Sequence, residues 1–260
     1  MADARRFWPV AFVFLVALGL ALVIRAPATT WAAGAERVGL IPDGIRWEAV
    51  HGRPWQGRAS EVVAPVGELG QVGWDLRPMS LLRGQLAVDI SWEPPRGGHL
   101  EGRGFAGLTS HGIRGLEGDL PASTLNHLDT GIPLLLDGTL RAHGVGLQIR
   151  RDGAIVAAGG SFQWLEAAAG LPRPVPLGEH QASLDALNER LQLQLASSPE
   201  AALGTSGRLA IDFRQPTPAV EADLQFEARD HADPGLHNFL RQQLEPDPQG
   251  HYRWTIQPES

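Results

Sequence analysis

Alternation of apolar and polar positions dominates the chain from about residue 36 onward. Leucine, valine, isoleucine and tryptophan occupy every second position of residues 86–92, with small or polar residues between them. The same period of two returns in residues 191–195, 209–213 and 220–226. A β-strand points successive side chains to opposite faces, so this pattern predicts strands with one apolar face and one polar, solvent-exposed face.

Turn residues separate these segments and indicate how they pair. Proline and glycine in residues 94–98 end the first strand, and the short link 216–218 predicts an antiparallel hairpin between the last two. The apolar phase shifts near Gly144, which predicts a β-bulge. Polar positions on nearly every strand favour an antiparallel sheet with one face covered over a parallel one. The sequence therefore predicts a mainly β fold, with a curved, mostly antiparallel β-sheet or an open sandwich.

Helices are expected at one or two short segments only. Residues 121–128 suit one or two turns. The stronger prediction starts at Asp233, a good N-cap residue, with Pro234 in the first helical position. Apolar residues at 236, 239, 240 and 244 then give one apolar stripe.

The N-terminal segment is different, because residues 7–24 are apolar and carry no charge. At about 1.5 Å per residue such a helix nearly matches a hydrocarbon core of about 30 Å. Arg5 and Arg6 precede it, and the positive-inside bias keeps such arginines in the cytoplasm. We therefore expect a cytoplasmic stub (1–6), a single transmembrane anchor (7–24) and a periplasmic β-rich domain (25–260) at a bacterial inner membrane.

A cleaved signal peptide is the alternative interpretation of this segment. Residues 33–35 (Ala-Gly-Ala) offer a small-residue cleavage site, but a signal core usually has only about 7 to 15 apolar residues. Trp8 and Trp31 flank the segment, as expected at the two interfaces of a retained span. A further, weak boundary near 170–178 could divide the β-rich domain, although a long loop inside one domain fits equally well.

Composition excludes several classes of function. The chain has 260 residues, enough to bury a core, and no cysteine, so disulfides, zinc–thiolate sites and thiol nucleophiles are excluded. The net charge is −7, and a chain of this charge without a basic stripe repels nucleic acid. Eight tryptophans stand beside one tyrosine. Core packing is their expected role, with an exposed groove for a lipid or peptide as the alternative.

No motif predicts catalysis. Residues 102–107 spell G-x-G-x-x-G, but they do not open a helix after an apolar strand, so a glycine-rich turn is the better interpretation. His231 and His237 have a proline and a glycine between them, and no G-x-S-x-G elbow occurs. We therefore expect no enzyme activity, no catalytic residue, no metal and no cofactor.

Several short motifs in a fixed order resemble a known family. Residues 52–59 (GRPWQGRA) are similar to the G-T-V-W-S-G-R-A element of type II secretion system protein N, also called general secretion pathway protein N. Arg53 and Pro54 depart from that element, where the family tends to have small or β-branched residues. The remaining matches are 72–84 (VGWDLRPMSLLRG), 116–121 (LEGDLP), 136–140 (LDGTL) and a hairpin over 204–226.

The resemblance covers nearly the whole chain and has several implications. It implies an accessory structural component of the machine that exports folded periplasmic proteins across the outer membrane. It implies other secretion components as partners, namely inner-membrane platform proteins, the periplasmic connector and the outer-membrane secretin. Gly52, Trp55 and Gly57 are the motif positions singled out, and glycines around an indole more often shape a turn than bind a partner. A periplasmic lipid-transfer or envelope-bridging β protein is the alternative function.

Overall fold

A computed structural model describes residues 45–127, 135–170, 173–215, 218–244, 246–247 and 250–256. The expected anchor at 7–24, with Arg5 and Arg6, lies outside these residues. Among the residues described, no helix has the length and apolar character needed to cross a membrane.

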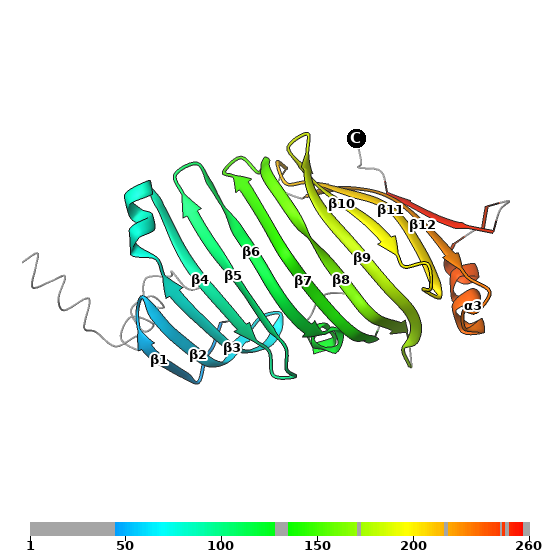
Figure 1. Ribbon diagram of the computed structural model, residues 1–260, viewed down its shortest axis with the longest axis horizontal. Coiled ribbons are helices and arrows are strands. Elements are labelled where there is room, and N and C mark those ends of the chain that lie inside the picture. The colour runs from blue at the N-terminus through cyan, green and yellow to red at the C-terminus, as the bar shows by residue number, and fades with distance from the viewer. Residues whose placement is uncertain are drawn as a thin grey trace, which may run out of the picture.

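The described residues form one 13-stranded sheet in which every strand pairs with its neighbour in sequence, always antiparallel (Figure 1). The strands are β1 (Ala49–Arg53), β2 (Gln56–Ala64), β3 (Gly67–Leu76), β4 (Gln85–Glu93), β5 (His99–Gly107), β6 (Ser110–Pro121), β7 (Leu135–Arg150), β8 (Ile155–Gly170), β9 (Val175–Leu187), β10 (Arg190–Ser197), β11 (Leu203–Asp212), β12 (Ala219–Ala228) and β13 (Tyr252–Ile256). The helical elements are the 3₁₀ helices η1 (Pro78–Arg83) and η2 (Ala122–His127), and the helix α3 (Pro234–Gln243).

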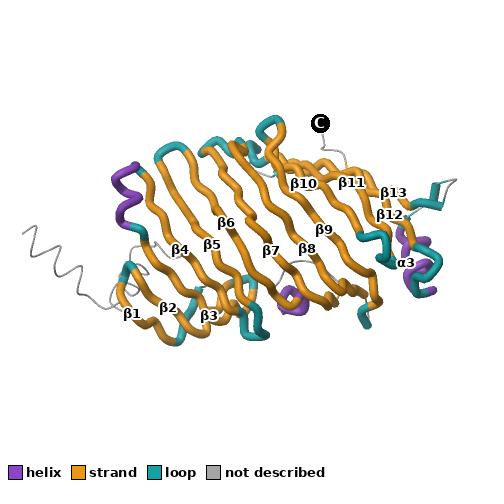
Figure 2. The backbone as a smooth tube through the Cα atoms, viewed as in Figure 1, coloured by secondary structure: helices purple, strands orange, loops and turns teal. Residues whose placement is uncertain are grey.

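The up-and-down order gives the sheet two ends with different connections. The β1–β2, β3–β4, β5–β6, β7–β8, β9–β10 and β11–β12 connections lie at one end, which we call the η1 end. The β2–β3, β4–β5, β6–β7, β8–β9, β10–β11 and β12–β13 connections lie at the other, which we call the α3 end. Figure 2 shows the helical elements at these ends rather than across the sheet. The sheet is therefore a single layer along most of its length.

Strand register sorts the side chains onto two faces, because directly paired residues share a face. Leu193 of β10 pairs with Leu184 of β9 and with Leu209 of β11. Its neighbour Gln194 pairs with Ser183 and Arg208 on the opposite face. The same division holds toward the β1 edge of the sheet, where Trp74 of β3 pairs with Ile90 of β4, and Asp75 with Asp89. One apolar face and one polar face thus run across the sheet, as the alternation predicts.

Irregular residues bend the long strands. Register shifts interrupt the pairing of β6 with β7 and of β7 with β8. One of the shifts between β7 and β8 lies between His143 and Gly146. It includes Gly144, whose φ of 58° favours glycine. The predicted bulge at this glycine is confirmed.

The main cluster of buried apolar side chains lies at the α3 end. Leu236 and Leu240 of α3 pack with Ala167, Leu177 and Tyr252 of the sheet. The Asp233 carboxylate accepts the backbone N–H of Gly235 at 2.6 Å, which caps the helix as predicted. Along the rest of the sheet, none of the large apolar side chains described is completely buried.

Most sequence predictions about the elements agree with this fold. The four alternating segments form β4, β10, β11 and β12, and the last two pair as the predicted antiparallel hairpin. The predicted turns near residue 121 form η2. The sheet stays open instead of folding into a sandwich, and over most of its length no described element covers the apolar face. The sequence predicts a sheet with one covered face, and in the structure that face is covered mainly near α3. The 3₁₀ helix η1 was not predicted from the sequence.

Three tryptophans on the apolar face join neighbouring strands or turns through hydrogen bonds from their indole N–H groups. The indole N–H of Trp74 donates to the carbonyl oxygen of Pro54 at 3.0 Å. Trp92 donates to Leu69 at 2.5 Å, and Trp164 to Asp137 at 2.8 Å. Each ring is half-buried, so it covers apolar surface while its polar atom is satisfied.

The Trp74 ring lies against Gly57, and this contact generates a prediction. A Cβ atom on Gly57 would stand 2.5 Å from the ring atom Cζ2 of Trp74 and 2.8 Å from the carbonyl oxygen of His51. Gly57→Ala should therefore displace the indole and lower the free energy of unfolding by about 1–3 kcal/mol, the usual cost of overpacking. Gly159→Ala is the matched control, because nothing lies within 4 Å of its added Cβ.

Chemical unfolding followed by tryptophan fluorescence measures both variants. The control should stay within about 1 kcal/mol of the parent. Equal stability of the two variants would mean that the ring does not rest on Gly57.

Candidate functional site

The described elements leave the apolar face open over most of its length. Contacts between elements are mostly between neighbours in the sheet, with η1, η2 and α3 as local additions. A hollow of about 470 Å³ lies on this face across β4 to β7, lined by Leu86, Val88, Ile113 and Leu147 among others. Such a surface suits an apolar ligand or the apolar side chains of a partner.

The polar face carries rows of ion pairs between neighbouring strands. Asp89 of β4 lies between Arg77 and Arg103, and the Arg103 Nε–Asp89 Oδ1 distance is 2.6 Å. Partial burial alone would raise the pKa of Asp89, but hydrogen bonds from the two arginines outweigh it and the pKa is lowered. Asp223 of β12 is paired in the same way with Arg253 of β13, at 2.8 Å. These pairs keep the polar face charged but nearly balanced.

A larger hollow, of about 940 Å³, lies over β1 to β6 and is lined mainly by polar-face residues. Its floor includes Gly73, where a Cβ atom would stand 2.5 Å from the Ser91 hydroxyl oxygen. Arg58 and Arg114 line it without a carboxylate partner among the described residues, and the Arg114 guanidinium lies 4.0 Å from the centre of the Phe105 ring. Carboxylates line the same hollow, so its charge is mixed and selects no single ligand class.

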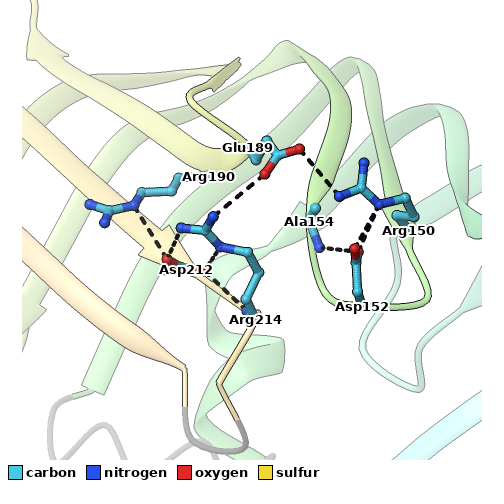
Figure 3. A network of polar contacts seen from close by, with 7 residues as sticks. All are labelled: Arg150, Asp152, Ala154, Glu189, Arg190, Asp212 and Arg214. Atoms are coloured by element: carbon cyan, nitrogen blue, oxygen red, sulfur yellow. Dashed lines mark hydrogen bonds and ion pairs between the residues drawn. The ribbon is translucent and has the colours of Figure 1, made fainter.

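A network of seven charged side chains joins three strand connections at the η1 end, and Figure 3 draws all of them except Glu221. Its members are Arg150, Asp152, Glu189, Arg190, Asp212, Arg214 and Glu221, which lies 3.6 Å from Arg190. Glu189, between β9 and β10, binds Arg150 at 3.2 Å and Arg214 at 3.5 Å. The network therefore holds the β7–β8 and β9–β10 turns against the end of β11.

The network is strongest at neutral pH. The hydrogen bond from the Arg214 side chain holds the pKa of the buried Asp212 well below its usual range. Because this pKa is lower in the folded chain than the unfolded value of about 3.9, the stabilisation is present above that pH. It is lost as the pH falls through the folded value.

The motif positions singled out in the sequence lie together in the β1–β2 hairpin. Gly52 and Gly57 are directly paired, and Gly52 has a φ of 97°. Trp55 stands in the turn between them, with the Arg53 guanidinium 5.8 Å from its ring centre. The Trp55 carbonyl accepts the backbone N–H of Leu76 at 2.6 Å, which fixes the hairpin to the end of β3. Each residue has a local structural task.

The residues considered for catalysis or metal binding do not come together. The G-x-G-x-x-G match lies inside β5, not at the start of a helix. His231 contacts the carbonyl oxygen of Glu200 at 3.2 Å, and His237 lies in α3. Across the described part of the chain, no three histidine or carboxylate side chains gather as a metal site.

One surface was missed at the sequence level. Met79, Leu81 and Leu82 of η1 are all strongly exposed. The adjacent leucines Leu81 and Leu82 break the period of two shortly after Pro78, and this break was the available signal.

The sequence of the chain is similar to a known protein family and to two of its members. The sequence model of the family described as "Type II secretion system (T2SS), protein N" matches residues 43–255. The chain is 33% identical over 106 residues to type II secretion system protein N of Vibrio cholerae serotype O1 (strain ATCC 39315 / El Tor Inaba N16961), a match that covers 38% of this chain and 41% of that protein. It is 29% identical over 202 residues to type II secretion system protein N of Aeromonas hydrophila, covering 74% of this chain and 76% of that protein. No solved structure matches significantly.

The family match spans the whole described sheet from β1 to β12 and most of β13, and it includes the hairpin with Gly52, Trp55 and Gly57. The order of motifs in the sequence and the match over residues 43–255 agree. The chain belongs to the type II secretion system protein N family.

Proposed function

We propose that the chain is an accessory, non-enzymatic structural component of the type II secretion system, which exports folded periplasmic proteins across the outer membrane. The observation that carries this proposal is the open single-layer sheet, whose two broad faces differ in character and remain accessible. A protein of this shape acts through the molecules that cover its faces and edges. Family membership supports the same role.

The topology that we propose places the sheet outside the cytoplasm. Residues 1–6, with Arg5 and Arg6, stay in the cytoplasm, residues 7–24 cross the inner membrane, and residues 25–260 face the periplasm. The partners proposed are inner-membrane platform proteins, the periplasmic connector and the outer-membrane secretin. Gly52, Trp55 and Gly57 shape the first hairpin of the domain and are not themselves the contact site.

Protease treatment of spheroplasts tests the topology. Protease added from outside should digest almost the whole chain, because only the six-residue stub and the anchor are protected. The length of the chain is followed by immunoblot, with a cytoplasmic protein as control for lysis. Digestion that requires permeabilised inner membranes, or a mature N-terminus near residue 36, would contradict the anchor.

Photo-crosslinking in cells tests the structural role. Gln85, Gln192 and Gln225 all lie on the polar face, in β4, β10 and β12. A photoreactive residue at one or more of these positions should trap a platform protein, the connector or the secretin. The same bands must disappear in a strain that lacks the trapped component. Crosslinks confined to proteins outside the secretion machine would count against the role.

A second candidate function is lipid binding or transfer, and the uncovered apolar face favours it. Leu193 and its paired residues Leu184 and Leu209 form part of an apolar row without a covering layer. Half-exposed leucines of this kind gain free energy when an acyl chain removes them from water.

Adjacent residues of β10 provide a matched test of lipid binding. A photoreactive residue in place of Leu193 faces the apolar side, whereas one in place of Gln192 faces the polar side. In cells grown with radiolabelled phosphate, labelled phospholipid should attach at position 193 and not at 192 if the face carries lipid. Labelling at neither position, or equally at both, would remove this candidate.

A further inference from the structure

Exposed apolar side chains gather at the η1 end of the sheet. They lie in η1 itself, in the β5–β6 turn and at the adjoining ends of β4, β8 and β9. Leu82 of η1 is 82% exposed, and Leu108 of the β5–β6 turn is 78% exposed. The full set is Met79, Leu81, Leu82, Leu86, Leu108, Val156 and Leu187. Such side chains on successive connections of one edge form a discontinuous apolar rim.

Hydrogen bonds hold these connections in place, so the exposed side chains have a defined direction. The Ser80 hydroxyl donates to the Arg77 carbonyl at 2.6 Å and accepts the backbone N–H of Ala87 at 3.0 Å. These bonds tie η1 to β4. The backbone N–H of Arg151 donates to the Thr109 carbonyl at 3.2 Å, which ties the β5–β6 turn to the β7–β8 turn.

The same end carries an excess of positive charge, although the whole chain has a net charge of −7. The described residues between strands at this end include four arginines, Arg77, Arg83, Arg151 and Arg214, against two carboxylates, Asp152 and Glu189. Both carboxylates are already paired with arginines. Arg83, beside Leu82, and Arg151, beside the β5–β6 turn, have no carboxylate partner among the described residues.

The described connections at the α3 end differ in charge. They carry four arginines, Arg96, Arg173, Arg229 and Arg241, and as many carboxylates, Glu200, Asp230, Asp233 and Asp247. A net positive charge of the described connections is therefore a property of the η1 end and not of strand connections in general.

We propose that the η1 end docks on a lipid bilayer with anionic headgroups, the membrane that holds the proposed anchor. Apolar tips from separate connections can enter the bilayer surface side by side, while neighbouring arginines remain at the phosphates. A protein partner would instead need one contiguous apolar patch, and the rim is discontinuous.

The length of the chain before the sheet allows this arrangement. The described chain enters the sheet at the α3 end, where Arg46 pairs with Val63. Residues 25–44 can span at most about 65–70 Å when extended, and the 16-residue strands are only about 50 Å long. The tether is thus long enough for the η1 end to return to the membrane of the anchor.

The absence of cysteine makes a single-label test possible. Leu82→Cys and Leu108→Cys each place an environment-sensitive fluorophore at the η1 end, and Val66→Cys places one in the β2–β3 turn at the α3 end. Val66 is the matched control, because it is apolar and 47% exposed. The full chain is reconstituted into vesicles of phosphatidylethanolamine and phosphatidylglycerol, and brominated lipids serve as quenchers.

Labels at positions 82 and 108 should shift to shorter wavelength and be quenched by brominated lipid, while the label at 66 stays in water. Vesicles of phosphatidylcholine alone, or the pair Arg83→Gln and Arg151→Gln in anionic vesicles, should reduce the shift. Flotation of the vesicles reports the anchor separately, so a failed anchor is distinguishable from failed docking. Labels at 82 and 108 that stay in water on floating vesicles, or a shift as large at 66, would overturn the proposal.

Discussion

Backbone hydrogen bonding between strands that are neighbours in sequence is the interaction on which the whole structure depends. Each of the 13 strands pairs only with the strands before and after it, so the sheet grows by addition of hairpins. No second layer of described elements closes over it, except near α3. Most domains gain stability from a core packed between two layers, and here such packing is concentrated at the α3 end. Elsewhere, side-chain hydrogen bonds add to the backbone hydrogen bonds between strands. The indole hydrogen bonds of Trp74, Trp92 and Trp164 are examples, and each joins neighbouring strands or hairpins.

A single layer also determines what the molecule can do. An apolar face that its own chain does not cover gains free energy from any suitable partner, whether a protein surface or acyl chains. The polar face is different, because its arginines and carboxylates are largely paired with one another, as Arg253 is with Asp223. We expect that face to recognise partners through shape and hydrogen bonds more than through net charge. The η1 end combines exposed leucines with unpaired arginines and is distinct from both faces.

Much of this fold follows from the sequence, because a period of two is a direct record of a half-exposed strand. The alternation in residues 86–92 and 191–195 correctly predicts β4 and β10, and Asp233 with Pro234 predicts the start of α3. The sequence could not decide between an open sheet and a sandwich, since both need the same alternation. It also hid η1, whose leucines look like strand residues until the Ser80 hydrogen bonds are known. The motif positions Gly52, Trp55 and Gly57 were found from family resemblance, but the close packing of Trp74 on Gly57 required the structure.

The openness of the apolar face is the central claim, and cysteine reactivity in the purified chain measures it most directly. Single cysteines in place of Val88 and Leu193 lie on the open part of the face, and one in place of Leu236 lies beneath α3. Rates of maleimide alkylation without denaturant should be high at positions 88 and 193 and low at 236. Protection at 88 and 193 equal to that at 236 would contradict the account, because it would mean that another part of the chain covers the apolar face.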